Sequence, residues 1–406
     1  MKTVDEHLRD VLAAVGPLEP VATGLGEAHG CVLAQDVHAS VALPGFDNSA
    51  MDGYAVRAAD LVGASEAEPV RLPVVGDIPA GTATLPTVGP GEAARIMTGA
   101  PLPPGADAIV QVEFTDGAMG TVAVHQPVQP GVHVRRAGED VALGELVLAA
   151  RSPLDAARIG LLAAAGESRP VVHPRPRVIV LSTGSELVEV GRPLGPGQIV
   201  DSNSYAIRAA AVEAGAVAER LTGVPDDPAT FAEVLADVVT RADLIVTTGG
   251  VSVGAYDVVK QALIDRPTMR FERVAMQPGK PQGFGTVDGT VVFTLPGNPV
   301  SALVSFEIFV RPVLLRMRGF VEVTRPTVEV TLAVAFTSPP GRRSFPRVRL
   351  ERAADGTLAA RPAGGQGSHQ MSALAGADAL LVIPENVTQA PAGARLTAIA
   401  IGGAGE

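Results

Sequence analysis

Tryptophan is absent from this chain of 406 residues, and aromatic residues make up only 3% of it. Because 47% of the residues are apolar all the same, the hydrophobic cores must consist mainly of aliphatic side chains. Cys31 is the only cysteine, which excludes an internal disulfide and favours a reducing compartment. The residues that follow it, Val32 and Leu33, are apolar, and we expect Cys31 to be a buried core thiol.

Basic residues are in the minority, since 32 lysines and arginines face 43 aspartates and glutamates and the formal charge is −11. A protein that binds nucleic acid through its phosphates usually presents a basic face, so we expect no nucleic-acid partner. Long apolar runs are also missing: the N-terminus has no apolar signal core, and Pro296, Glu307 and Arg311 interrupt the longest stretch, 291–315. We therefore expect a cytoplasmic protein with no membrane partner.

Several familiar catalytic motifs are missing. The seven histidines lack the H-E-x-x-H spacing of zinc enzymes, and the sequence contains neither G-x-x-x-x-G-K-[ST] nor G-x-S-x-G. These absences argue against a zinc enzyme, a P-loop nucleotidase and an α/β-hydrolase.

The pattern of residues changes along the chain. The capping box Thr3–Glu6 opens an amphipathic helix, and Ser152–Asp155 predicts the start of a second helix, with a proline in its first turn. Between them, residues 44–137 contain short apolar strands separated by Pro/Gly turns, which indicates a β-rich insertion. The flanking segments, 1–43 and 138–170, would then pack together as one discontinuous, elongated domain.

From 171 to 319, apolar strands alternate with helices, which predicts a doubly wound α/β domain with a mostly parallel sheet. The predicted strands are 177–182, 216–222, 243–248, 271–276 and 290–295. The predicted helices are 204–214, 228–240, 255–263 and 300–317. Residues 320–406 return to β-type patterns and predict a small C-terminal β-domain. Its predicted strands are 327–336, 347–352, 379–384 and 394–401.

Ligands of an open parallel sheet bind beyond the carboxyl ends of its strands, so the loops that follow the five predicted α/β strands are informative. These loops are 182–186, 223–227, 248–257, 277–281 and 295–299. All of them contain glycine, proline or both, which allows a ligand to approach the backbone closely. Several lead into a helix N-terminus, where free N–H groups favour phosphate.

Three of these loops also carry acids, Glu186, Asp226 and Asp257. Carboxylates beside a phosphate repel it unless a cation intervenes, and Mg²⁺ held by one or two carboxylates and by substrate oxygens would resolve the conflict. Lys280 would add a fixed positive charge. Two simpler interpretations stay open: Asp226 and the aspartate after it could cap the next helix, and Lys280 could be an ordinary surface lysine.

Two further segments stand out. Pro44–Ala55 combines two acids, polar amides and glycines with little helical or strand period, and a capped turn is its simplest interpretation. Gly341–Arg349 is the only basic cluster of the chain, and it could be a solvated strand edge or an anion contact.

These segments closely resemble the molybdopterin molybdenumtransferase family, which performs the last step of molybdenum-cofactor synthesis and includes the C-terminal part of gephyrin. The resemblance covers nearly the whole chain. Its motifs are Pro44–Tyr54, Ile96–Pro101, Gly138–Asp140, Ser182–Leu187, Thr248–Asp257, Pro278–Pro281, Leu295–Ala302 and Gly367–His369. The first and the fifth are highly specific.

The resemblance implies an α/β multidomain fold with four domains. The expected boundaries are 1–43 with 138–170 for the elongated domain, 44–137 for the β-rich insertion, 171–319 for a molybdopterin-adenylyltransferase-like α/β domain and 320–406 for a C-terminal β-barrel. It also implies a homodimer and a substrate, adenylylated molybdopterin. With molybdate and a divalent cation, expected to be Mg²⁺, the family inserts molybdenum into the dithiolene and releases AMP. A molybdopterin adenylyltransferase is the partner that could hand over this substrate.

The functional positions of the family carry over one by one. The expected catalytic residues are Asp52, Thr98, Asp140, Glu186, Asp257 and Lys280. The expected substrate-binding residues are Thr183, Gly184, Asp226, Gly249, Gly250, Ser252, Arg273, Gln277, Pro296, Pro299, Arg347 and Ser368. Glu186 and Asp257 are the expected metal ligands. Because the family composes its cleft at the dimer interface, Asp52 and Thr98 would face the α/β domain of the partner subunit.

Arg273 and Gln277 depart from the family, some members of which have lysines there. Arg273 keeps the charge, although arginine and lysine are not equivalent at a close contact, whereas Gln277 loses it. We therefore expect altered anion affinity at Gln277, and a choice of another anion such as tungstate stays open.

Two other functions stay open as well. A molybdopterin adenylyltransferase shares the α/β architecture, but its corresponding loop typically reads T-G-G-T-G, whereas this chain has Thr248–Gly254 with a different sequence. A non-enzymatic scaffold is the other alternative, because gephyrin also anchors partners.

Overall fold

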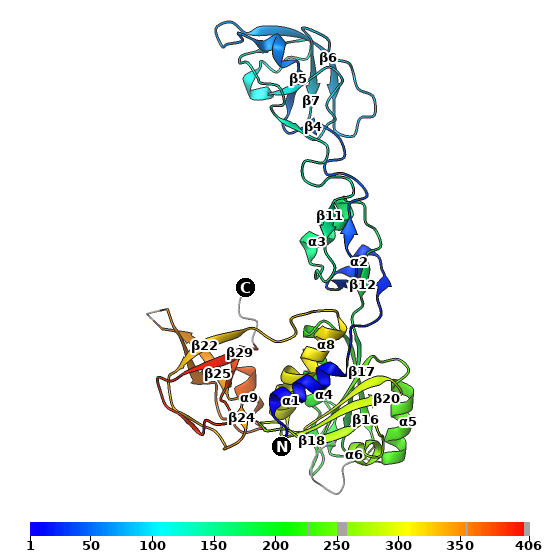
Figure 1. Cartoon of the computed structure of the whole chain (residues 1–406), viewed down its shortest axis with the longest axis vertical. Coiled ribbons are helices and arrows are strands. Elements are labelled where there is room, and N and C mark those ends of the chain that lie inside the picture. The colour runs from blue at the N-terminus through cyan, green and yellow to red at the C-terminus, as the bar shows by residue number, and fades with distance from the viewer. Residues whose placement is uncertain (226, 250–257, 354–355, 402–406) are drawn as a thin grey trace. The chain divides into compact units, whose positions relative to one another are not determined.

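The structure of the chain, a computed structural model, describes residues 1–225, 227–249, 258–353 and 356–401. The chain divides into two compact units, both drawn in Figure 1. The larger unit comprises Met1–Val21, Gly30–Ala34 and Val172–Glu406, and the smaller unit comprises Ala22–His29 and Gln35–Val171. Within the described residues, no helix has both the length and the apolar character that a membrane crossing requires.

A six-stranded sheet forms the centre of the larger unit. Its strands, in spatial order, are β16 (Val217–Val224), β13 (Arg177–Thr183), β17 (Leu244–Thr248), β21 (Thr290–Leu295), β20 (Pro281–Val287) and β18 (Arg270–Arg273). The first four run parallel, whereas β20 is antiparallel to both of its neighbours. Because β18 is antiparallel to β20, it runs in the same direction as the four parallel strands. The five strands that the sequence predicted, β13, β16, β17, β18 and β21, therefore all end at one edge of the sheet.

Strand β20 is the one that the sequence did not predict, because Pro281, Gly283 and Gly285 interrupt its apolar pattern. The two glycines are required by close packing. A Cβ on Gly283 would lie 1.8 Å from Thr294 Oγ1, and a Cβ on Gly285 would lie 2.2 Å from Thr268 O.

Helices cover both faces of the sheet, as the alternating pattern predicted (Figure 1). On one face, α5 (Pro228–Val238) and α6 (Val258–Leu263) pack against alternate residues of β13 such as Ile179. On the other face lie α4 (Asn203–Glu213), α7 (Pro299–Ser305) and α8 (Arg311–Met317), with Val178 and Val180 beneath them.

The predicted helix 300–317 is interrupted. A π-helical turn at Phe306–Val310 separates α7 from α8. Pro312 accounts for the interruption, because it has no N–H to donate to the carbonyl four residues earlier and its ring displaces that carbonyl.

Helix α1 (Val4–Ala13) begins with the predicted capping box. Thr3 Oγ1 accepts from Glu6 N at 3.2 Å, and Glu6 Oε2 accepts from Thr3 N at 2.8 Å. The apolar face of α1 packs into the core of the larger unit, whereas residues 22–29 and 35–43 belong to the smaller unit. Residues 1–43 are thus divided between the two units, and the four-domain boundaries stay a prediction.

The C-terminal part of the larger unit contains the expected barrel, which is closed. Its strands are β22 (Thr327–Leu332), β26 (Leu358–Pro362), β25 (Arg347–Arg352), β27 (Ala379–Val382) and β29 (Arg395–Ala400). The predicted strand 271–276 was too long, because the chain leaves β18 after Arg273. It then forms β19 (Met276–Gln277), which pairs in parallel with β24 (Arg343–Ser344) of the barrel region.

The smaller unit confirms the β-rich insertion. Its five-stranded sheet has the order β8 (Ala108–Gln111), β5 (Gly53–Val56), β7 (Ala93–Ile96), β6 (Val70–Ile78) and β9 (Thr121–Val124). The second predicted helix is α3 (Ala156–Ala164). Its cap is Asp155, which accepts from Arg158 N at 2.9 Å, and not Ser152 as the sequence suggested.

Short elements complete the two units. They are β1 (Val21–Ala22), α2 (Leu25–Ala28), β2 (Val32–Leu33), β3 (Val37–His38), β4 (Asn48–Ser49), β10 (Val134–Arg135), β11 (Leu146–Leu148), β12 (Val171–His173), β14 (Leu187–Val188), β15 (Ile199–Val200), β23 (Phe336–Thr337), α9 (Met371–Ala375) and β28 (Gln389–Ala390). Cys31 is buried, as expected, and burial raises the pKa of its thiol.

Candidate active site

Three loops converge at the carboxyl edge of the six-stranded sheet. Gly249, which follows β17, donates from its backbone N to Leu295 O at the end of β21 at 3.0 Å. A Cβ on Gly249 would lie 3.6 Å from Thr183 O, at the end of β13. A Cβ on Gly297, in the loop after β21, would lie 3.6 Å from Gly249 Cα. The predicted residues Thr183 and Gly249 are therefore neighbours, and the backbone is open to a ligand here.

The carboxylate of Glu186 turns back toward Gly184. Gly184 has φ +146°, and a Cβ there would lie only 2.7 Å from Glu186 Oε2, so any larger residue would displace the carboxylate. The backbone of Glu186 is fixed from the other side, because its carbonyl accepts from Ile199 N at 2.8 Å. Glu186 is exposed, and its carboxylate is the type of ligand that Mg²⁺ prefers.

Asp201 and Asn203 hold two of the converging loops in place, and neither was predicted. Asp201 is only 3% exposed, and its carboxylate accepts from Ser182 Oγ at 2.6 Å and from N and Oγ of Ser204 at 3.1 and 2.7 Å. Asn203 Nδ2 donates to Gly297 O at 2.7 Å. Asp201 thus ties β13 to α4, and Asn203 ties α4 to the loop after β21. The sequence did contain a signal for Asp201, since Asp-Ser directly before a helix is a capping pattern.

Ser368 joins the same edge from the barrel region. Asn298 Nδ2 donates to Ser368 Oγ at 3.0 Å, and Val300 N donates to Ser368 O at 3.1 Å. Between these contacts, Pro299 opens α7, and Pro296 is buried just after β21. The predicted Pro296, Pro299 and Ser368 therefore belong to one continuous part of the edge.

Lys280 lies in the turn between β19 and β20, directly before β20 begins at this edge. Gln282 Nε2 donates to Gly279 O at 2.6 Å and to Ser305 Oγ at 2.7 Å, so a buried amide holds the turn against α7. Gln282 was not among the residues predicted from the sequence. Within the residues that the structure describes, no carboxylate forms an ion pair with Lys280, and such an ammonium is suited to an anionic ligand.

Gln277 and Arg347 line one cavity of about 300 Å³ on the barrel side of that turn. Arg347 is 1% exposed, and its Nη2 donates to the carbonyls of Gly365 and Gly367 at 2.9 and 3.1 Å. Arg273 is exposed at the end of β18 and does not line this cavity.

Four of the predicted residues, Asp226, Gly250, Ser252 and Asp257, lie outside the described residues. Asp227 is described, and its Oδ2 accepts from Thr230 N at 2.7 Å, which confirms the simpler interpretation of that aspartate as a helix cap. Among the described residues, no group of three or more histidine, cysteine or acidic side chains is placed to hold a metal.

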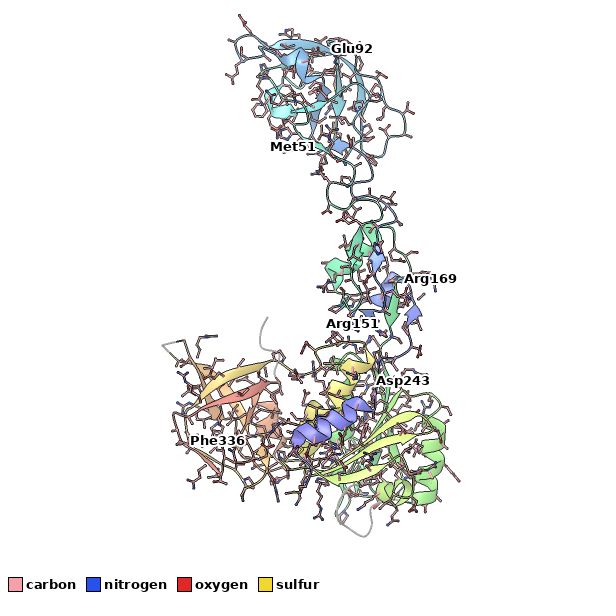
Figure 2. All side chains as sticks on the ribbon, viewed as in Figure 1. Met51, Glu92, Arg151, Arg169, Asp243 and Phe336 are labelled. Atoms are coloured by element: carbon pink, nitrogen blue, oxygen red, sulfur yellow. The ribbon has the colours of Figure 1, made fainter. Side chains whose placement is uncertain are left out.

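Asp52 and Thr98 meet in the smaller unit. The pairing of β5 with β7 sets Gly53 opposite Ile96, so the turns next to these residues lie side by side. Asp52 Oδ1 accepts from Thr98 N at 2.7 Å and from Thr98 Oγ1 at 2.8 Å. These two bonds, the backbone one first, lower the pKa of the Asp52 carboxyl below its ordinary value. Figure 2 labels Met51, the residue before Asp52.

Asp140 is exposed in another part of the smaller unit. Its backbone N donates to Leu43 O at 3.0 Å. In this unit, all of which the structure describes, no hydrogen bond joins Asp140 to Asp52 or Thr98.

Three family profiles match nearly the whole chain. The MoeA N-terminal region (domain I and II) matches residues 2–166, the "Probable molybdopterin binding domain" matches 179–316, and the MoeA C-terminal region (domain IV) matches 329–401. Molybdopterin molybdenumtransferase 2 of Mycobacterium tuberculosis is 48% identical over 402 residues, which cover 98% of each chain. The chain belongs to the molybdopterin molybdenumtransferase family.

Other members of this molybdenumtransferase family are similar over the same length. The molybdopterin molybdenumtransferase of Haemophilus influenzae is 34% identical, with 98% of each chain covered. The crystal structure of the molybdopterin biosynthesis MoeA protein from Pyrococcus horikoshii has a TM-score of 0.80 at 32% identity, and 98% of each chain is covered. The resemblance inferred from the motifs is thereby confirmed, together with the α/β multidomain fold.

Proposed function

We propose that this protein inserts molybdenum from molybdate into adenylylated molybdopterin and releases AMP. The observation that supports this most strongly is the full-length match to enzymes of that name, at 48% identity over 98% of the chain. The chain also matches the MoeA N-terminal and C-terminal regions, at 2–166 and 329–401, on either side of the α/β part. These two matches favour a molybdenumtransferase over a molybdopterin adenylyltransferase, which shares only the α/β architecture.

The converging loops supply the chemistry that a pyrophosphate substrate needs. The backbones around Thr183 and Gly249 can approach the phosphates closely. Lys280 would neutralise part of the negative charge that develops as the phosphoanhydride is cleaved and AMP leaves. Asp201 and Asn203 do not reach the substrate in this account; they position the loops that do.

We also propose Mg²⁺ as the cation of the site. The exposed Glu186 carboxylate next to Gly184 fits the oxygen ligands that Mg²⁺ prefers, and Asp257 is the second ligand that the resemblance implies. The ion would neutralise pyrophosphate charge when bound. Removal of divalent cations with EDTA should therefore abolish AMP release, and added Mg²⁺ should restore it.

We further propose a cytoplasmic homodimer whose active site combines residues of both subunits. Asp52 and Thr98 would act on substrate held by Glu186 of the partner subunit, and the exposed, ionised Asp52 suits that role. A mixture of Asp52→Ala and Glu186→Ala subunits tests this. If the site is composite, mixed dimers regain activity that neither variant has alone; if each subunit carries its own site, the mixture stays inactive.

The main experiment incubates the purified protein with adenylylated molybdopterin, Mg²⁺ and either molybdate or tungstate, and follows AMP and metal-loaded product. The proposal predicts AMP release that depends on the oxyanion and on Glu186. No AMP release under any of these conditions would contradict it. Adenylylation of free molybdopterin at the expense of ATP would instead support the adenylyltransferase alternative. Transfer of substrate from a molybdopterin adenylyltransferase, the partner we expect, can be measured by adding that enzyme.

A further inference from the structure

The basic cluster at 341–349 contains four arginines, and two of them have ordinary structural partners. Arg343 forms ion pairs with Asp5 at 2.7 and 2.8 Å and with Glu385 at 3.1 Å. Arg349 Nε donates to a backbone carbonyl at 2.9 Å. Arg343 thus joins the barrel region to α1, and Arg349 is bonded within the barrel region, so both have structural roles.

The other two, Arg342 and Arg347, have no carboxylate partner within the part of the chain that the structure describes. Arg342 is half-buried, and its Nη1 donates to Gln277 Oε1 at 3.2 Å. The backbone fixes this neighbourhood, because Phe345 N donates to Gln277 O at 2.8 Å and β19 pairs with β24. Since the amide of Gln277 is neutral, the guanidinium of Arg342 keeps its full positive charge beside it.

Gln277 and Arg347 share the walls of the 300 Å³ cavity with Phe336, which is labelled in Figure 2, and with Ser344. Arg347 donates only to carbonyls, and its Nε has no hydrogen-bond partner among the described residues. Carbonyls do not neutralise a guanidinium, and burial lowers the pKa of Arg347. A buried cation without a counter-ion is costly, and an anion in the cavity would relieve that cost.

We propose that Arg342 is a substrate-binding residue of this chain, which supplies beside the cavity the positive charge that Gln277 lacks. The ligand is a tetrahedral oxyanion, and its cationic partners are Arg342 and Arg347. This inference rests on the proposed function, whose reactants offer two groups of that kind: molybdate and the phosphates of adenylylated molybdopterin. Arg342, which lies 65 positions from Gln277 in the sequence, then retains the affinity for an anion beside Gln277.

The test uses four variants of the full-length protein: Arg342→Ala, Gln277→Lys, the double variant, and Arg395→Ala as a matched control. Arg395 is an exposed arginine of the same barrel, paired with Glu329 at 3.5 Å, so its removal changes the net charge equally. Binding of inorganic molybdate and of inorganic phosphate to the protein alone is measured by equilibrium dialysis. The KM for molybdate and the KM for adenylylated molybdopterin are measured from AMP release.

Arg342→Ala should weaken oxyanion binding about 10-fold and change kcat less than about 2-fold, because a charge close to the ligand is lost while the reacting groups stay in place. The double variant should return to within about 3-fold of wild type, since lysine at 277 restores the charge. A raised KM for molybdate identifies molybdate as the ligand, and a raised KM for the adenylylated substrate alone identifies its phosphate.

Unchanged oxyanion binding in Arg342→Ala, or an equal loss in Arg395→Ala, would overturn the assignment of Arg342. A protein that binds molybdate through Arg342 but releases no AMP would refute the proposed function and leave this assignment standing.

Discussion

Replacement of Asp201 by alanine tests whether a buried carboxylate sets the geometry of the candidate site. Asp201 accepts three hydrogen bonds, from Ser182 Oγ and from N and Oγ of Ser204. A hydrogen bond to a charged group contributes about 1.5–3 kcal/mol, but the two hydroxyls can rotate toward other acceptors. We therefore expect Asp201→Ala to lower the free energy of unfolding by about 3 kcal/mol, and Asp201→Asn, which keeps one acceptor oxygen, to lower it by about half as much.

The same change should lower activity. Ser182 lies directly before the predicted substrate-binding residues Thr183 and Gly184, and a displacement of about 1 Å in a positioning element can reduce turnover about 10²-fold. Urea unfolding followed by circular dichroism gives the stability, and AMP release gives kcat/KM. Asp237→Ala is the matched control, because Asp237 is exposed on α5 and its one ion pair among the described residues is with Arg241, at 3.4 Å. A free energy of unfolding for Asp201→Ala within about 0.5 kcal/mol of wild type, the range of a surface substitution, would refute this structural role of Asp201.

Three further predictions concern other parts of the chain. Gln282→Leu removes the amide that holds Gly279 and should lower kcat/KM about 10-fold with Lys280 still present. Gln282→Glu cannot donate these bonds and should be equally affected. Urea unfolding shows whether each variant is folded, and an unchanged kcat/KM in a folded variant would contradict the positioning role of Gln282. Thr98→Val removes the hydroxyl donor to Asp52, so the pKa of Asp52 should rise and the acid limb of the pH–activity profile should move to higher pH. If the acid limb of the variant coincides with that of wild type, ionised Asp52 does not take part in the reaction. Burial lowers the pKa of His7 below 6.5 despite the opposing effect of Glu272, so the stability that neutral His7 contributes is present above that pH and is lost as the pH falls. His7→Gln should therefore flatten the dependence of the urea midpoint on pH between about 7 and 5. An equally steep dependence in the variant would exclude His7 as the source of the pH dependence.

The fold was largely predictable because apolar periodicity and turn residues follow local rules. The strands at 177–182 and 243–248 and the cap at Thr3 are cases in which local pattern and tertiary packing agree. The failures come from tertiary requirements. Gly283 and Gly285 interrupt the apolar pattern of β20, so the strand was not predicted. They are glycines because Thr294 and Thr268 of neighbouring segments pack directly against them, and a local sequence pattern does not reveal such contacts.

Glu186 and Lys280 were proposed from their residue type and their position after a predicted strand; the structure places both at the carboxyl edge of the sheet, and their roles stay predictions. The residues that hold these groups were missed, since a buried Asp201 or Gln282 becomes recognisable only when its distant partners are known. Gln277 illustrates the same limit. Its loss of charge was evident in the sequence, whereas the neighbouring Arg342 is brought to it by the pairing of β19 with β24.

The most direct measurement of the central claim is the ratio of molybdenum incorporated to AMP released when the purified protein meets adenylylated molybdopterin, Mg²⁺ and molybdate. We predict one molybdenum incorporated per AMP released, with both lost together in Glu186→Gln. AMP release that proceeds equally well without molybdate, or that survives in Glu186→Gln, would contradict a molybdenum insertion carried out by the loops at this edge of the sheet.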